Sequence, residues 1–101
     1  MESLRDKNRK PTHGGALLRE DILPTLNLTQ GELATKLGVS RRTISEILHE
    51  KRPITPDMAI RIGMFTNTTP QSWLNMQQTL DLWQLQQTNA RAYAQIKRIA
   101  A

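Results

Sequence analysis

The chain of 101 residues is long enough for one small domain with a single hydrophobic core, and too short to enclose a sizeable substrate cavity. Its formal net charge of +5 favours a polyanionic partner, although charge alone does not separate DNA from RNA. The lack of cysteine excludes disulfides, thiolate zinc sites and thiol catalysis. No apolar run approaches the length of a membrane span, so we expect a protein of the cytoplasm.

The first 12 residues predict a flexible N-terminal arm, because mixed charges and a proline accompany one large apolar residue after the initiator, Leu4. From Gly14 onward, helix signals repeat and the alternation typical of strands is nearly absent. We therefore predict an all-α fold, with a domain over residues 13–86 and a C-terminal helical extension or tail over residues 87–101.

The first two helices are predicted from apolar spacing and from capping residues. Leucines and an isoleucine at helical spacing indicate a helix over about residues 14–25, and Pro24 should end or distort it. The second helix has the clearest start signal, with Thr29 as N-cap and Glu32 completing a capping box. Gly38 should end it in the left-handed conformation.

Three further helices each follow a side-chain cap. Ser40 precedes the third, Thr55 and Pro56 begin the fourth, and Thr69 and Pro70 begin the fifth. Each cap contributes about 1 kcal/mol, and their agreement favours a bundle of helices.

The segment Gly-Val-Ser at residues 38–40 joins two short helices in the pattern of a helix-turn-helix. The glycine permits a sharp turn, and Val39 fills the angle between the helices. Ile44, Ile47 and Leu48 form the inward face of the third helix. The positions left on its outer face are 41, 42, 43, 45, 46 and 49.

Two adjacent arginines, Arg41 and Arg42, stand in the first turn of the third helix, where the helix dipole disfavours cations. In a DNA major groove, however, a guanidinium can bind both O6 and N7 of guanine, which gives about 1–3 kcal/mol of discrimination. Glu46 can accept from a cytosine amino group or orient Arg42 through an i,i+4 contact. The residues predicted to read bases are Arg41, Arg42, Thr43, Ser45 and Glu46, of which Thr43 and Ser45 can also touch phosphates.

A second group of polar residues flanks the third helix and is suited to the DNA backbone. Gln30 lies at the N-terminus of the second helix, whose free N–H groups attract phosphate. The residues predicted to contact phosphates are Gln30, Ser40, His49, Lys51 and Arg52.

Other conspicuous residues are predicted to be structural. Trp73 and Trp83 lie on an apolar stripe, and three methionines are expected to fill the core, namely Met58, Met64 and Met76. His13 is expected to cap a helix locally or to face solvent. Asp81 and the Arg-Glu-Asp run at residues 19–21 should be solvated or ion-paired.

The sequence shows no catalytic triad, phosphate loop, paired-carboxylate pocket or metal-ligand spacing, so we predict neither an enzyme nor a cofactor or metal site. The C-terminal half has more apolar residues than one small core needs. Trp83, Tyr93 and Ile96 are therefore predicted to form a dimer interface.

Three stretches are more specific than a bare helix-turn-helix: "HGGALLREDILP", "LGVSRRTISEILHEKRPITPDMAIR" and "TPQSWLNMQQTLDLWQ". Through them, residues 13–86 resemble the HigA/VapI-type antitoxins of the XRE (Cro/C1-like) helix-turn-helix class. That family commonly has proline after the opening histidine, where this sequence has Gly14. The difference affects the first helix cap and leaves the predicted DNA surface unchanged.

The resemblance implies a five-helix, lambda-repressor-like domain that represses its own operon in a bacterium or phage. It also implies that the chain binds and neutralises a partner toxin, a HigB/RelE-like endonuclease that cleaves mRNA on the ribosome. By analogy, recognition falls to the same residues of the third helix, with Gln30 toward phosphate.

The predicted assembly is a homodimer that presents its third helices to successive major grooves, about 34 Å apart, on an inverted repeat of operator DNA. Such a protein would associate with the nucleoid when bound, with no membrane or small-molecule partner. Two alternatives are a stand-alone phage-type repressor without a toxin and a protein-interaction helix-turn-helix module that binds no DNA.

Overall fold

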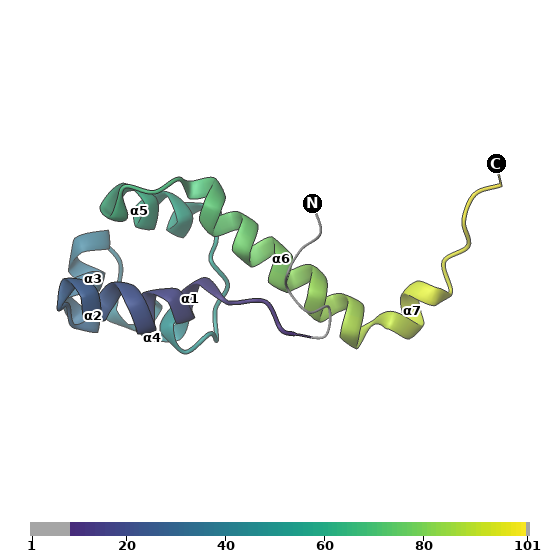
Figure 1. Ribbon diagram of the computed structural model, residues 1–101, viewed down its shortest axis with the longest axis horizontal. Coiled ribbons are helices and arrows are strands. Elements are labelled where there is room, and N and C mark those ends of the chain that lie inside the picture. Colours follow the sequence, from purple (N-terminus) through teal and green to yellow (C-terminus); the bar gives the residue numbers. More distant parts are fainter. Residues whose placement is uncertain (1–8, 101) are drawn as a thin grey trace.

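The computed structural model describes residues 9–100, which form helices joined by short turns, with no strand in that range (Figure 1). The elements are α1 (Gly14–Leu17), the π-helix η1 (Leu18–Ile22), α2 (Leu23–Leu26), α3 (Gln30–Leu37), α4 (Arg41–Leu48), α5 (Pro56–Thr66), α6 (Pro70–Thr88) and α7 (Ala90–Ala94). The all-α prediction is confirmed. Most of the predicted arm, residues 1–8, lies outside the described residues; residues 9–12 form no helix, and Pro11 is buried.

The first predicted helix is one continuous helical run made of α1, η1 and α2. The N–H of Leu23 bonds to the carbonyl of Leu18, five residues back, so this turn is wider than an α-helical one. Pro24, which follows directly, has no N–H to donate. The distortion predicted near Pro24 is thus confirmed as a π-turn, and the run ends where Asn27 takes a left-handed φ of 54°.

The four predicted threonine and serine caps are all formed. Each hydroxyl accepts a hydrogen bond from the N–H three residues ahead, at Thr29, Ser40, Thr55 and Thr69. The N–H of Thr29 also donates to Glu32 Oε1 at 2.9 Å, which completes the predicted capping box. Gly38 has the predicted left-handed φ of 72°.

The core is formed by side chains from η1, α2, α3, α4, α5 and the first half of α6. The largest fully buried side chains are Leu18, Leu33, Ile44, Ile47, Leu48 and Ile62. Trp73 and Met58 are buried as predicted, and Met76 is partly buried against the core. The prediction for Met64 is wrong, since its side chain is 81% exposed. Two residues beyond the buried Ile62, it lies about 200° around the helix from the core.

α1 crosses α4 at backbone distance because Gly15 has no side chain. A Cβ at this position would overlap the carbonyl oxygen of Ile47 and lie 2.8 Å from its carbonyl carbon. Gly63 permits a similar approach, but to the carbonyl of Thr68 in the loop before α6 rather than to a helix. The contact at Gly15 therefore allows α1 and α4 to pack at this short distance.

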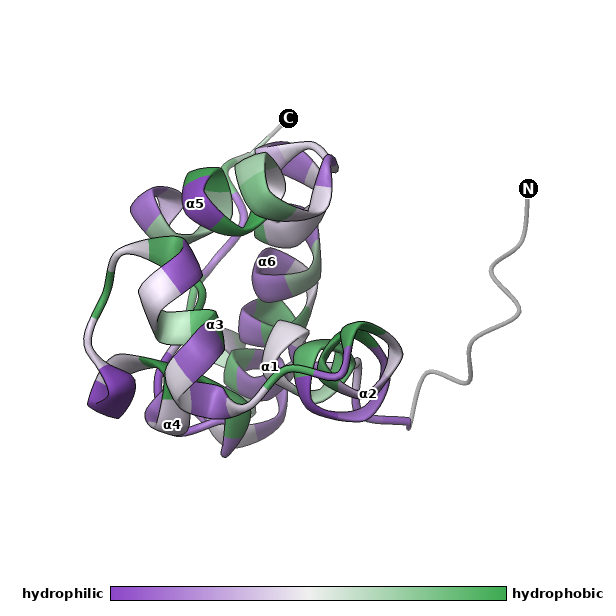
Figure 2. Ribbon diagram, turned by 90° about the vertical axis from the view of Figure 1, so that its left-hand side faces the viewer, coloured by the Kyte–Doolittle hydropathy of each residue, from purple (hydrophilic) through white to green (hydrophobic). Residues whose placement is uncertain are grey.

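The views in Figures 1 and 2 place α4 and α5 on opposite sides of the body, with α3 between them. The second half of α6 and α7 extend away from that body, so the molecule measures 54 × 29 × 22 Å (Figure 1). The predicted boundary at residue 87 falls inside α6, and residues 95–100 form no helix. Their isoleucines, 96 and 99, are exposed, which deprives a short helix of the packing it needs.

Candidate nucleic-acid interface

The turn between α3 and α4 is held from behind by Arg61 of α5. Its Nη1 donates to the carbonyls of Leu37 at 2.9 Å and Gly38 at 3.4 Å, where the end of α3 leaves acceptors free. Its Nε donates to Asp57 Oδ2 at 2.8 Å. Sequence reasoning did not single out Arg61, because its spacing from Asp57 indicates only a helix ion pair. Nothing in the sequence indicates a contact 23 or 24 residues away.

His13 connects the start of α1 to the loop that follows α4. Its Nδ1 accepts from the N–H of Gly15 at 2.8 Å, and its Nε2 donates to the carbonyl of Arg52 at 3.1 Å. These two bonds require the neutral imidazole with its proton on Nε2. Burial lowers the pKa of His13, which favours that form. The predicted local cap is therefore formed, together with a tertiary bond that the sequence did not indicate.

The loop after α4, residues 49–54, is fixed at two further points. Gln77 of α6 is buried, and its Oε1 accepts from the N–H of Ile54 at 2.7 Å. Arg19 Nη1 donates to the carbonyl of Leu48, the last residue of α4, at 2.5 Å, and pairs with Glu50 at 3.3 Å. Arg19 also pairs with Glu20, so the ion pairing predicted for this run is confirmed there.

With its inner face anchored, α4 presents the predicted base-reading residues outward. Arg41 and Arg42 are exposed in the first turn, and the side chain of Arg42 is 85% accessible. Thr43, Ser45 and Glu46 follow on the same helix and are half-buried. The structure thus brings all five residues onto one helix whose apolar side is buried.

Glu46 is paired with two arginines. It accepts from Arg42 Nε at 3.3 Å and from Arg52 Nη2 at 2.6 Å, and Arg52 Nη1 also donates to Thr43 Oγ1 at 3.4 Å. The hydrogen bonds from Arg42 and Arg52 lower the pKa of Glu46, so the carboxylate is ionised at neutral pH. The i,i+4 contact with Arg42, one of the two predicted roles of Glu46, is present in the structure.

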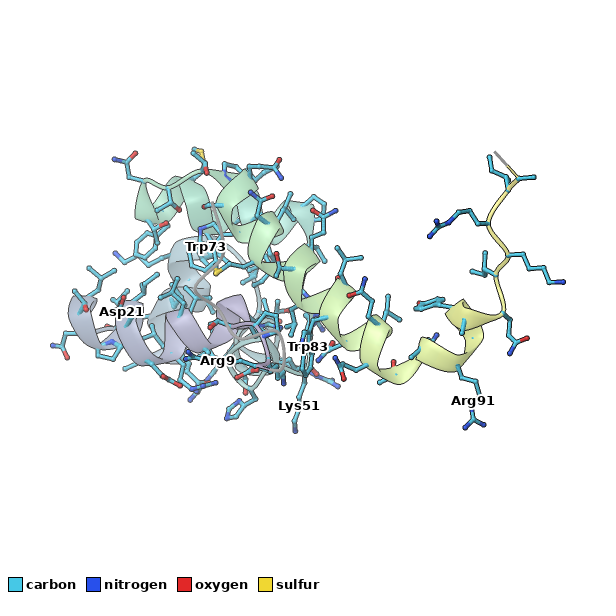
Figure 3. All side chains as sticks on the ribbon, turned by 45° about the vertical axis from the view of Figure 1, so that its right-hand side comes forward. Arg9, Asp21, Lys51, Trp73, Trp83 and Arg91 are labelled. Carbon is cyan, nitrogen blue, oxygen red and sulfur yellow. The ribbon has the colours of Figure 1, made fainter. Side chains whose placement is uncertain are left out.

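The predicted phosphate contacts occupy several positions around this helix. The Ser40 hydroxyl caps α4 and bonds the Thr43 hydroxyl at 2.9 Å, and the exposed His49 donates through Nδ1 to the carbonyl of Ser45 at 2.7 Å. Lys51 is exposed, and Figure 3 shows its side chain extending away from the body. Gln30 is the first residue of α3 and is half-buried.

The three residues predicted for a dimer interface lie on the C-terminal extension, here the second half of α6, α7 and the residues that follow. Trp83 is half-buried on α6, Tyr93 of α7 is 41% exposed, and Ile96 is 73% exposed. Figure 3 shows Trp83 near the root of the extension, whereas Trp73 lies inside the body.

Within residues 9–100, no helix has both the length and the apolar character needed to cross a membrane. The same part of the chain contains no group of three or more acidic or histidine side chains arranged to hold a metal ion.

Two short helices, α3 and α4, joined by the turn at residues 38–40, with the second helix exposing its arginines, form the arrangement of a helix-turn-helix protein. Residues 18–73 match the family described as "Helix-turn-helix", and the chain belongs to it. Virulence-associated protein I of Dichelobacter nodosus is 44% identical over 77 residues, which cover 75% of this chain and 71% of that protein.

Two solved structures are similar over most of the chain. The Pseudomonas aeruginosa antitoxin HigA, solved with the higBA promoter, has a TM-score of 0.84 and 33% identity, covering 89% of this chain and 99% of that one. Antitoxin GraA in complex with its operator has a TM-score of 0.84 and 33% identity, covering 98% and 100%. These similarities confirm the HigA/VapI-type resemblance and a class of DNA-binding regulators rather than enzymes.

Proposed function

We propose that this chain is the antitoxin of a type II toxin–antitoxin module, which represses its own operon and neutralises a HigB/RelE-like toxin that cleaves mRNA. The observation that carries the proposal is the exposed first turn of α4, with Arg41 and Arg42 facing outward from a helix that is anchored on its other side. Similar proteins described as antitoxins were solved with promoter or operator DNA, which supports the same role for this surface.

In this proposal α4 enters the major groove and its outer residues read base edges. Arg41 and Arg42 bind guanine, Thr43 and Ser45 contact bases or phosphates, and Glu46 orients Arg42 or accepts from cytosine. The phosphate contacts are assigned to Gln30, Ser40, His49, Lys51 and Arg52. Because Arg52 is already paired with Glu46, its phosphate contact requires that ion pair to open or to be shared.

The proposed assembly is a homodimer on an inverted repeat, joined through the extension. The apolar side chains of that extension are exposed at Leu82, Leu85, Tyr93, Ile96 and Ile99, in a segment that projects from the body. A second copy would bury them and set two α4 helices about 34 Å apart. The protein would act in the bacterial cytoplasm, on the nucleoid when bound to its operator.

The experiment that tests this proposal is a footprint on the DNA upstream of the chain's own gene, with and without the product of the adjacent gene. We expect a protected inverted repeat, and a change in its protection when the adjacent product is added. In a separate assay, a complex of the two proteins should block mRNA cleavage. Failure to protect any upstream site would refute the repressor role.

A stand-alone repressor is the second candidate. A relative from Haemophilus influenzae, 42% identical over 78 residues, is described as an HTH-type transcriptional regulator, which favours this candidate. This candidate predicts the same footprint, but no adjacent gene whose product arrests growth.

A further inference from the structure

One carboxylate lies within the otherwise cationic outer surface of α4. Glu46 is 3.3 Å from Arg42 Nε, in the first turn of the helix, and 2.6 Å from Arg52 Nη2, beyond its end. The other terminal nitrogen of Arg52 donates to the Thr43 hydroxyl. A single carboxylate therefore holds arginines from the two ends of the same surface.

A guanidinium in such a pair has to leave or share its carboxylate before it can bind a phosphate. The carboxylate itself repels phosphates that approach the surface, because two negative charges at short range disfavour each other. On DNA of arbitrary sequence nothing compensates for these two costs. At a matching site, a cytosine amino group can donate to the carboxylate, or a guanine can take the oriented Arg42.

We propose that Glu46 is a specificity-determining residue that suppresses binding to non-operator DNA by keeping Arg42 and Arg52 from its phosphates. This inference rests on the proposed DNA-binding function. It assigns to Glu46 an effect on arbitrary DNA, in addition to any contact that it makes with a base.

The test compares the full chain with Glu46→Gln, which keeps the side-chain shape and removes the charge. Affinities are measured over a range of salt for the upstream operator fragment and for a mixed-sequence duplex of equal length. Each guanidinium released to a phosphate should steepen the salt slope by about one, and raise affinity for the mixed duplex about eightfold at about 0.1 M salt. Because the operator gains less, the ratio of operator to mixed-sequence affinity should fall, by up to about eightfold for each guanidinium released.

Glu20→Gln is the matched control, because it makes the same charge change at a residue of η1 paired with Arg19. It should leave the affinity ratio unchanged. Glu46→Asp retains the charge and should keep a higher ratio of operator to mixed-sequence affinity than Glu46→Gln. Far-UV circular dichroism checks that each variant keeps its helices.

The results separate the two proposals. If the unaltered chain does not prefer the upstream fragment, the proposed function fails before any variant is considered. If it does prefer that fragment, but Glu46→Gln behaves like Glu20→Gln or loses affinity for both duplexes in proportion, only the role of Glu46 is overturned. Equal loss of discrimination in Glu46→Asp and Glu46→Gln would also overturn it.

Discussion

Replacing Gly15 by alanine tests whether the close backbone contact between α1 and α4 is needed for a stable fold. The added Cβ would lie 2.8 Å from the carbonyl carbon of Ile47, whereas carbon atoms pack at about 3.5–4.0 Å. The two helices would therefore have to separate by at least about 0.7–1.2 Å, and by more to clear the carbonyl oxygen of Ile47. Both sides of this contact are backbone, so no side chain can rotate away to relieve it.

The expected cost is at the upper end of the range for overpacking, about 3 kcal/mol. Alanine's better helix propensity offsets about 0.5–1 kcal/mol of that, which leaves a net loss of about 2–2.5 kcal/mol. For a chain of this size, the midpoint of thermal unfolding should fall by about 8–20 °C. Urea and thermal unfolding followed by circular dichroism measure the loss.

Gly31→Ala provides the control, because a Cβ at Gly31 of α3 would have no neighbour within 4 Å. This variant should be more stable than the unaltered chain by about 0.5–1 kcal/mol. If Gly15→Ala were as stable as Gly31→Ala, the argument from close backbone contact would be wrong.

Three further predictions concern the proposed DNA-binding surface of α4 and the residues that support it. Arg42→Ala should relax base preference, because it removes a proposed base contact. Lys51→Ala should weaken binding to all sequences and flatten the salt slope by about one. If both variants lost equal affinity for operator and mixed DNA, the assignment would be contradicted. Arg61→Ala should lower the free energy of unfolding by about 1.5–3 kcal/mol, because the end of α3 loses a charged donor, and an unchanged urea midpoint would refute that role. Burial lowers the pKa of His13 in the folded chain, so near and below about pH 6.5 the unfolded chain binds more protons than the folded chain. The free energy of unfolding should therefore decrease as the pH is lowered. Urea unfolding at about pH 7.5 and 5.5 should show a smaller fall in His13→Asn, which can still cap α1.

Much of the fold was predictable because its signals are local. A threonine or serine cap needs only its own side chain and an N–H three residues ahead, and all four caps formed where the sequence placed them. The left-handed turn at Gly38 is similarly local, because it follows from the missing Cβ. The inward face of α4 followed from helical spacing, and its outer face with Arg41 and Arg42 is what remained.

The errors and omissions arise where distant segments meet. Met64 was assigned to the core because methionine is apolar, but the burial of α5 on one side only leaves it exposed. The contacts of Arg61 with the α3–α4 turn and of Gln77 with Ile54 join residues more than 20 positions apart, and no spacing rule connects them.

The sequence by itself determined the helices, their caps, the turn at residues 38–40 and the outward position of Arg41 and Arg42, since each depends on neighbours within about one or two turns. Only the tertiary structure decided how that helix is held: by Gly15 against the Ile47 backbone, by Arg61 behind the turn, and by His13 against the following loop. It also decided that Glu46 is shared by Arg42 and Arg52, because the second of these arginines reaches the helix only after the chain has turned back along it.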